Sequence, residues 1–150
     1  MKKWTLILAI TSLSIGFMSF QLQQFSQDVS LSGWNQGVQG YIKGVRQQKN
    51  NAKPVVALFY TDWCPNCKKL REDILSTPVF KEFAENNLIT VRINPETGPM
   101  ENQLAEEFGV IGYPSFFIIQ ANSPNAKIIR KTSHISPEEF ILQIKEAIKS

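Results

Sequence analysis

The chain has 150 residues, of which 43% are hydrophobic and 19% are charged, and its formal net charge is +3. A chain of this size and composition holds one compact domain with a short appendage, and it is too apolar to be disordered. Because Lys2 and Lys3 supply two of the three surplus charges, residues 21–150 carry only +1, which argues against nucleic acid as a partner.

An uncharged apolar run of 17 residues, Trp4 to Phe20, follows the two lysines at the start of the chain. This order is typical of an export signal and would leave the lysines in the cytoplasm. Residues 1–20 are therefore predicted to be a signal peptide or a membrane anchor, with residues 4–20 in the membrane. An uncleaved anchor is favoured, and cleavage near Ser14-Ile15-Gly16 is the alternative. In both cases the domain would face the periplasm or another extracytoplasmic space.

Residues 21–50 are predicted to be a spacer followed by an amphipathic helix. Glutamine and serine dominate residues 21–31, whereas apolar residues recur at helical spacing from Trp34 to Val45. Ser32 is the candidate N-cap, and Asn50-Asn51 is expected to break the helix. Three glycines weaken this helix, so it should need the domain to pack against.

Strands and helices alternate in residues 51–150, which predicts an α/β domain. Continuous apolar runs predict buried strands. Capping residues predict the helices, above all Ser136, Pro137 and Glu139, which form a capping box for the last one. The expected strands are Val55–Tyr60, Leu88–Ile93, Ser115–Gln120 and Lys127–Lys131, and the expected helices begin near Cys64, Thr77, Asn102 and Ser136.

The chain has only two cysteines, Cys64 and Cys67, with Pro65-Asn66 between them. A bond across so short a gap constrains the unfolded chain very little, so a structural staple is a poor reason for this spacing. The preceding strand and the following helix place Cys64 at a helix N-terminus, where backbone N–H groups stabilise a thiolate. Cys64 is therefore the candidate nucleophile, and Cys67, one turn later, is the candidate resolving thiol.

Other uses of the cysteine pair fit the sequence less well. A zinc site needs a second pair of ligands, which His134 alone does not supply. A c-type haem needs a histidine directly after the second cysteine, where Lys68 stands. A cysteine protease needs a partner histidine, but His134 is expected to be a solvated loop residue. Disulfide exchange is favoured over an inert structural bond and over metal binding, and no cofactor is expected.

Three blocks of the sequence resemble the thioredoxin family at the family's spacing: Pro54 to Lys68, Val91 to Asn94, and Phe108 to Phe117. The resemblance implies a thioredoxin-like fold, with a central mixed β-sheet flanked by helices, over residues 51–150. It also implies a cis Tyr113-Pro114 bond beside the cysteines, with the Tyr113 backbone free to pair with an extended substrate. Trp63 would shield the thiols. Trp63, Tyr113 and Pro114 are thus the candidate substrate-binding residues.

The chain departs from the family at two positions. Leu58 stands where cytosolic thioredoxins carry a buried Asp that helps to move protons to and from the second cysteine, and Arg92 matches the site of their buried Lys. Asp62 or Glu72 is a candidate substitute for the missing acid.

The N-terminal run makes the chain similar to membrane-tethered, thioredoxin-like reductases of the periplasm or thylakoid lumen. We therefore expect a monomeric thiol-disulfide oxidoreductase, more a reductase than an oxidant, which acts on exported proteins and is recharged by a membrane electron donor. Two alternatives stay open. One is a disulfide oxidant or isomerase with the same residues, and the other is a client-binding module whose cysteines stay idle.

Overall fold

The computed structural model describes residues 31–121, 123, 125–130, 132 and 134–149. Gly33–Ser150 forms one compact unit. The predicted signal or anchor, residues 1–20, lies outside the described residues, as does most of the predicted spacer. Within the described part of the chain, none of the helices combines the length and the apolar character that a membrane span requires.

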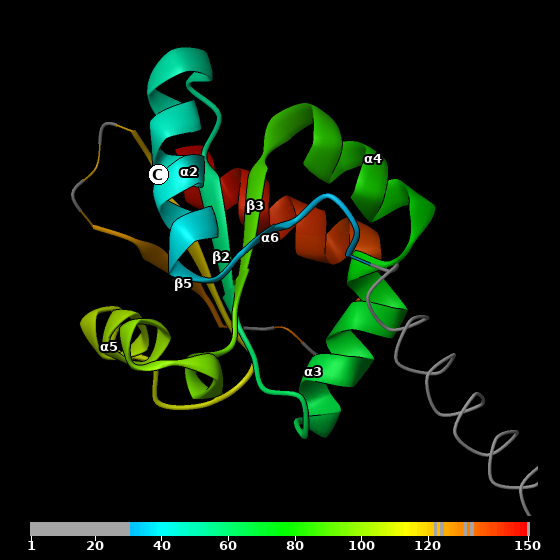
Figure 1. The fold of residues 1–150 in the computed structure, drawn as a ribbon. Helices are drawn as coiled ribbons and strands as arrows, with labels where there is room; N and C mark the ends of the chain where they lie inside the picture. The colour runs from blue at the N-terminus through cyan, green and yellow to red at the C-terminus, as the bar shows by residue number, and fades with distance from the viewer. Residues whose placement is uncertain (1–30, 122, 124, 131, 133, 150) are drawn as a thin grey trace, which may run out of the picture. The chain divides into compact units, whose positions relative to one another are not determined.

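A five-stranded mixed sheet forms the centre of this unit (Figure 1). Its strands stand in the order β1-β3-β2-β4-β5. The strand β3 runs parallel to β1 and β2, whereas β4 runs antiparallel to β2 and β5. The predicted mixed sheet is thus confirmed. The strands are β1 (Asn35–Gln36), β2 (Val55–Phe59), β3 (Ile89–Ile93), β4 (Ser115–Ile119) and β5 (Lys127–Ile129).

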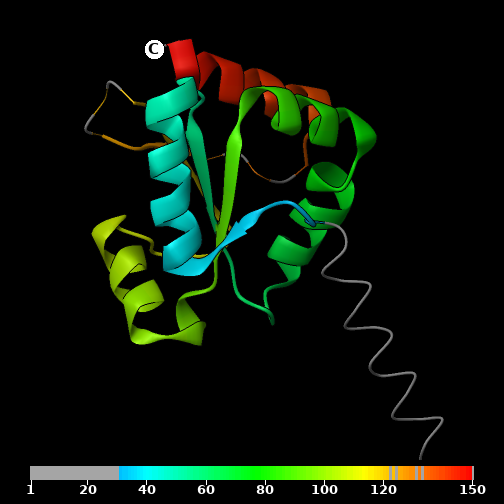
Figure 2. The same ribbon diagram turned by 45° about the horizontal axis from the view of Figure 1, so that its top comes forward.

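Helices cover both faces of the sheet, as the two views in Figures 1 and 2 show. On one face lie α2 and α5, and on the other lie α4 and α6, with η1, the continuation of α3, packed against α4 and α6. A π-helical turn, η1, continues α3, and a 3₁₀ turn, η2, precedes α5. The bounds are α2 (Gly37–Asn51), α3 (Pro65–Leu70), η1 (Arg71–Leu75), α4 (Pro78–Asn87), η2 (Pro95–Thr97), α5 (Pro99–Glu107) and α6 (Pro137–Lys149).

The strand β2 is the centre of the core, since all five of its residues are buried. This agrees with the prediction from its continuous apolar run, which is typical of a strand covered on both faces. Aromatic rings fill the layer on each side. Phe59 and Phe117 pack against Phe108 with ring centroids 5.2 and 5.1 Å away. On the opposite side, Phe140 of α6 packs against Phe116 at 5.0 Å and Phe80 at 5.9 Å.

The first described strand, β1, was not expected from the sequence. Asn35 and Gln36 pair with Val91 and Arg92 at the edge of the sheet, and the Asn35 side chain donates a hydrogen bond to the Thr90 carbonyl. Because these two residues are extended, the helix begins at Gly37 and not after Ser32. The prediction that Ser32 caps this helix is therefore wrong.

The glycines of α2 have a packing role that their low helix propensity hides. Gly40 and Gly44 are buried on the side of the helix that meets the sheet. A Cβ atom at Gly40 would lie 2.8 Å from the Asn35 backbone, and one at Gly44 would lie 3.2 Å from methyl groups of Ile89 and Val91. The helix thus approaches the strands more closely than larger residues would allow.

Candidate active site

Cys64 and Cys67 form a disulfide at the start of α3, with their Cα atoms 5.3 Å apart. Cys64 is the N-cap residue and has extended backbone angles, and Pro65 is the first helical residue. The sulfur of Cys64 accepts a hydrogen bond from the Cys67 N–H, at 3.1 Å. A proline at the first helical position sacrifices no hydrogen bond. The local sequence therefore begins the helix at the cysteine.

The surroundings of Cys64 favour a negative sulfur once the disulfide is reduced. The first turn of α3 contains no acidic residue, and Lys68 and Lys69 follow in its last turn. Unpaired N–H groups and the positive end of the helix dipole stabilise an anion at this position. A thiolate, not a thiol, is the nucleophile in disulfide exchange. The arrangement can therefore support reversible thiol-disulfide chemistry.

The register of the sheet brings the cysteines close to the Tyr113-Pro114 bond. Phe59, the last residue of β2, pairs with Ser115, the first residue of β4. Because these strands are antiparallel, the segment after Phe59 and the segment before Ser115 leave the same end of the sheet. The Tyr113-Pro114 peptide bond is cis, as the family resemblance implied.

The sulfurs are largely covered, whereas the ring beside them is exposed. Cys64 and Cys67 are only 5% and 8% exposed, but Trp63 is 68% exposed. The Trp63 ring meets the Tyr113 ring edge to face, with centroids 6.5 Å apart. Three of the predicted site residues, Cys64, Trp63 and Tyr113, thus lie together, and Pro114 follows directly.

Two polar residues that contact Trp63 and its neighbour Asp62, namely Glu96 and Asn94, were not predicted as site residues from the sequence. The Trp63 indole N–H donates a 2.8 Å hydrogen bond to the Glu96 carboxylate. The Asn94 side chain donates to the Asp62 carboxylate and accepts from the Glu96 backbone N–H. An available signal was the Asn94-Pro95 pair directly after a predicted strand, which marks a cap and a first helical residue.

Leu58 and Arg92, where the chain departs from thioredoxins, are both buried and pair across β2 and β3. The two acids that were considered as substitutes for the missing buried Asp are exposed. Asp62 accepts a hydrogen bond from Asn94, and Glu72 lies 4.0 Å from both Lys68 and Arg71. Each carboxylate is therefore solvated and engaged with other side chains.

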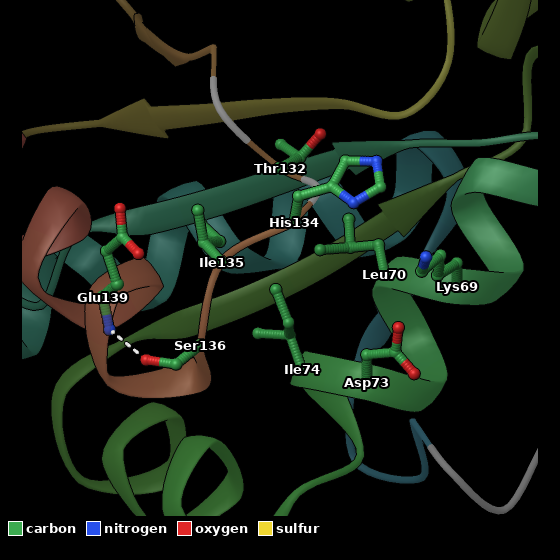
Figure 3. Close-up of a pocket in the computed structure, with 9 residues that line it drawn as sticks. All are labelled: Lys69, Leu70, Asp73, Ile74, Thr132, His134, Ile135, Ser136 and Glu139. Carbon is green, nitrogen blue, oxygen red and sulfur yellow. Dashed lines mark hydrogen bonds between the residues drawn. The ribbon is translucent and has the colours of Figure 1, made fainter.

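A cavity of about 320 Å³ lies between the helical segment α3–η1 and the residues that lead into α6. Figure 3 shows that Leu70, Ile74 and Ile135 form its apolar part, with His134 above Leu70. His134 is exposed, as expected for a loop residue. Neither cysteine lines this cavity. No group of three or more metal-binding side chains occurs in the described part of the chain.

Comparison with known proteins gives matches over most of the chain. The model of the thioredoxin-like domain family matches residues 43–148. The disulfide bond reductase DsbH of Chlamydia pneumoniae is 32% identical over 93 residues, which cover 55% of this chain and 55% of that protein. The chloroplastic thioredoxin-like protein HCF164 of Oryza sativa is 26% identical over 144 residues, which cover 95% of this chain and 50% of that protein. The chain thus spans about half the length of these relatives.

The fold also matches a solved structure. The structure of a DsbH oxidoreductase superimposes with a TM-score of 0.65 at 22% identity, covering 81% of this chain and 89% of that one. At this identity the likeness supports the fold alone. Together with the cysteine pair, the family match identifies the Cys64–Cys67 site as a thiol-disulfide centre.

Proposed function

This chain belongs to the thioredoxin-like domain family, and from that premise we propose that it is a thiol-disulfide oxidoreductase that reduces disulfides in exported proteins. The observation that carries the proposal is the Cys64–Cys67 disulfide at the start of α3. The chemistry needs only these two sulfurs and a donor of electrons.

Reduction of a client would proceed in two exchange steps. The Cys64 thiolate attacks one sulfur of the client disulfide, so that a mixed disulfide forms and the other client sulfur leaves as a thiolate. The Cys67 thiolate then attacks the Cys64 sulfur and releases the second client thiolate. The client gains two electrons and two protons, and Cys64–Cys67 becomes a disulfide. A dithiol donor must then reduce it again.

The proposed direction rests on one observation, since the chain is 32% identical over 93 residues to a protein named as a disulfide bond reductase. The first turn of α3, which has no acidic residue and is followed by two lysines, stabilises the Cys64 thiolate that attacks a disulfide. It does not set the direction, because stabilising the reduced form also makes a dithiol a weaker reductant. Trp63, Tyr113 and Pro114 would form the surface on which the client lies, with the Tyr113 backbone pairing with an extended segment.

The cellular setting is proposed from the N-terminal sequence. Residues 1–20 would be a signal or, as we favour, a membrane anchor. Residues 21–50 would supply a spacer and the amphipathic helix that packs on the thioredoxin-like domain of residues 51–150 and completes its compact unit. An anchored domain would face the periplasm, a comparable extracytoplasmic space or the thylakoid lumen. A membrane protein would supply electrons, and the enzyme would work as a monomer.

The test is reduction of insulin disulfides, with dithiothreitol as the donor, by the parent protein and by Cys64→Ser and Cys67→Ser variants. Serine has nearly the same size but cannot form a disulfide. We expect Cys64→Ser to be inactive, and Cys67→Ser to accumulate mixed disulfides with clients. Equal activity in the parent and both variants would refute the proposed mechanism.

The direction is tested by equilibrating the Cys64–Cys67 couple with a dithiothreitol or glutathione buffer. A reduction potential well below about −200 mV supports a reductase, whereas one near about −120 mV supports an oxidant. A pair that does not titrate at all would leave only a client-binding module.

A further inference from the structure

We infer that Glu96 is a positioning residue that fixes the Trp63 indole as a rigid wall of the client-binding surface. This inference rests on the proposed function. Glu96 exerts its effect through Trp63, whose indole N–H it binds. It belongs to η2, 33 residues along the chain from Trp63.

The geometry that supports this role is a ring of hydrogen bonds that the main chain closes. The Trp63 indole N–H donates to the Glu96 carboxylate at 2.8 Å. The Glu96 backbone N–H donates to the Asn94 side-chain oxygen at 3.0 Å. The Asn94 side-chain nitrogen donates to the Asp62 carboxylate at 3.2 Å. Because Asp62 and Trp63 are neighbours in the sequence, the ring returns to its starting point.

The ring is anchored in the fold at Asn94, which is only 6% exposed. Asn94 directly follows β3, whose last residue, Ile93, pairs with Phe59 at the end of β2. The Thr97 hydroxyl also donates to the Asn94 carbonyl, at 2.7 Å. Asp62 and Asn94 therefore both follow the same end of the paired central strands β2 and β3. This gives Glu96 a fixed position from which to hold the indole.

An indole as exposed as that of Trp63 would otherwise turn among several rotamers. Trp63 is 68% exposed, and the Glu96 hydrogen bond and the Tyr113 ring contact orient its ring. A side chain that is already ordered costs less entropy when a client binds. Glu96 should therefore lower the KM for a protein client without changing the chemistry at the sulfurs.

The test compares Glu96→Ala with Glu96→Gln, which keeps an oxygen that can accept the indole hydrogen bond. Glu82→Ala, an exposed carboxylate of α4, is the matched control for lost charge. Reduction of insulin gives KM and kcat for each protein. The exchange rate of the Trp63 indole proton, assigned by NMR from the signal lost in Trp63→Phe, reports the hydrogen bond in the oxidised protein directly.

We expect Glu96→Ala to raise KM about three- to tenfold with little change in kcat, and to speed exchange of the Trp63 indole proton. Glu96→Gln should stay near the parent in both readouts, as should the control. An unchanged KM in Glu96→Ala would overturn the inference, and so would a fall in kcat alone. Equal defects in Glu96→Ala and Glu96→Gln would show that charge, not position, matters, and would also overturn it. A parent protein that fails to reduce insulin would instead refute the proposed function.

Discussion

The helices α2 and α3 begin in different ways, although neither has an acidic residue in its first turn. At the start of α2, the cap comes from another helix, since the Glu101 carboxylate of α5 accepts a 3.2 Å hydrogen bond from the Val38 N–H. At the start of α3, the cap is the Cys64 sulfur itself. A carboxylate neutralises the positive end of a helix, whereas sulfur is a weak acceptor and leaves that end available.

The start of α2 contributes to the stability of the fold, whereas the start of α3 contributes to the reactivity of Cys64. The positive end of α2 is used to fasten two helices to each other through the Glu101 carboxylate. The positive end of α3 is left for the anion that forms when the disulfide is reduced. Substitutions at the two helix starts should therefore act on different properties of the protein.

The largest effect is expected at α2. Replacing Glu101 by alanine removes a cap that joins two elements, and it should lower the free energy of unfolding by about 1–2 kcal/mol. Glu101→Gln keeps an acceptor and should lose less. Urea unfolding of the oxidised protein measures both, with Glu106→Ala, an exposed neighbour in α5, as the control. A Glu101→Ala protein as stable as the control would show that this contact does not cap α2.

A smaller effect, and one of a different kind, is expected at α3. Asn66→Asp places a carboxylate in the first turn, beside Cys64. The added charge should stabilise the helix but disfavour the thiolate, so that alkylation of the reduced protein by iodoacetamide at pH 7 slows about two- to fivefold. Asn66→Ser is the neutral control. If Asn66→Asp reacts as fast as Asn66→Ser, the helix start does not activate Cys64.

The smallest effect concerns Tyr41, one turn into α2. Burial, and next the charge of Glu107, raise the pKa of Tyr41 above 10.0. The folded protein therefore holds the phenol proton more tightly than the unfolded chain does. This contribution to stability is complete below pH 10 and is lost as the pH rises through the raised pKa.

The measurement is urea unfolding across the alkaline range for the parent protein and Tyr41→Phe. Above pH 10 the parent should lose stability more steeply than the variant, because phenylalanine has no proton to release. Parallel curves would mean that the phenol is as acidic in the folded protein as in the unfolded chain.

Elements with a strong local pattern were predictable from the sequence. The apolar run that forms β2 and the capping residue Thr77 are examples. At α6 the Glu139 N–H donates to the Ser136 hydroxyl, which is the N-cap half of the predicted capping box. The cysteine pair was also predictable, because its spacing, the preceding strand and the following helix all lie within a dozen residues.

Features that depend on pairing between distant segments were not predictable. Asn35-Gln36 has no strand pattern of its own, and it becomes β1 only because the edge of β3 is open to it. The hydrogen bond of Glu96 joins residues 33 positions apart, and that of Glu101 joins residues 63 positions apart. No local sequence pattern indicates either contact. The low helix propensity of Gly40 and Gly44 indicated a helix that needs the domain to pack against, but not that their missing side chains allow its close approach to the strands.

The close seating of Gly40 and Gly44 on the strands has a practical consequence for anyone who trims this protein. A fragment that starts after Asn51 would lose the helix that shields Ile89 and Val91, and it would leave that apolar sheet surface open to other molecules. The smallest portion worth expressing alone therefore begins no later than Gly33.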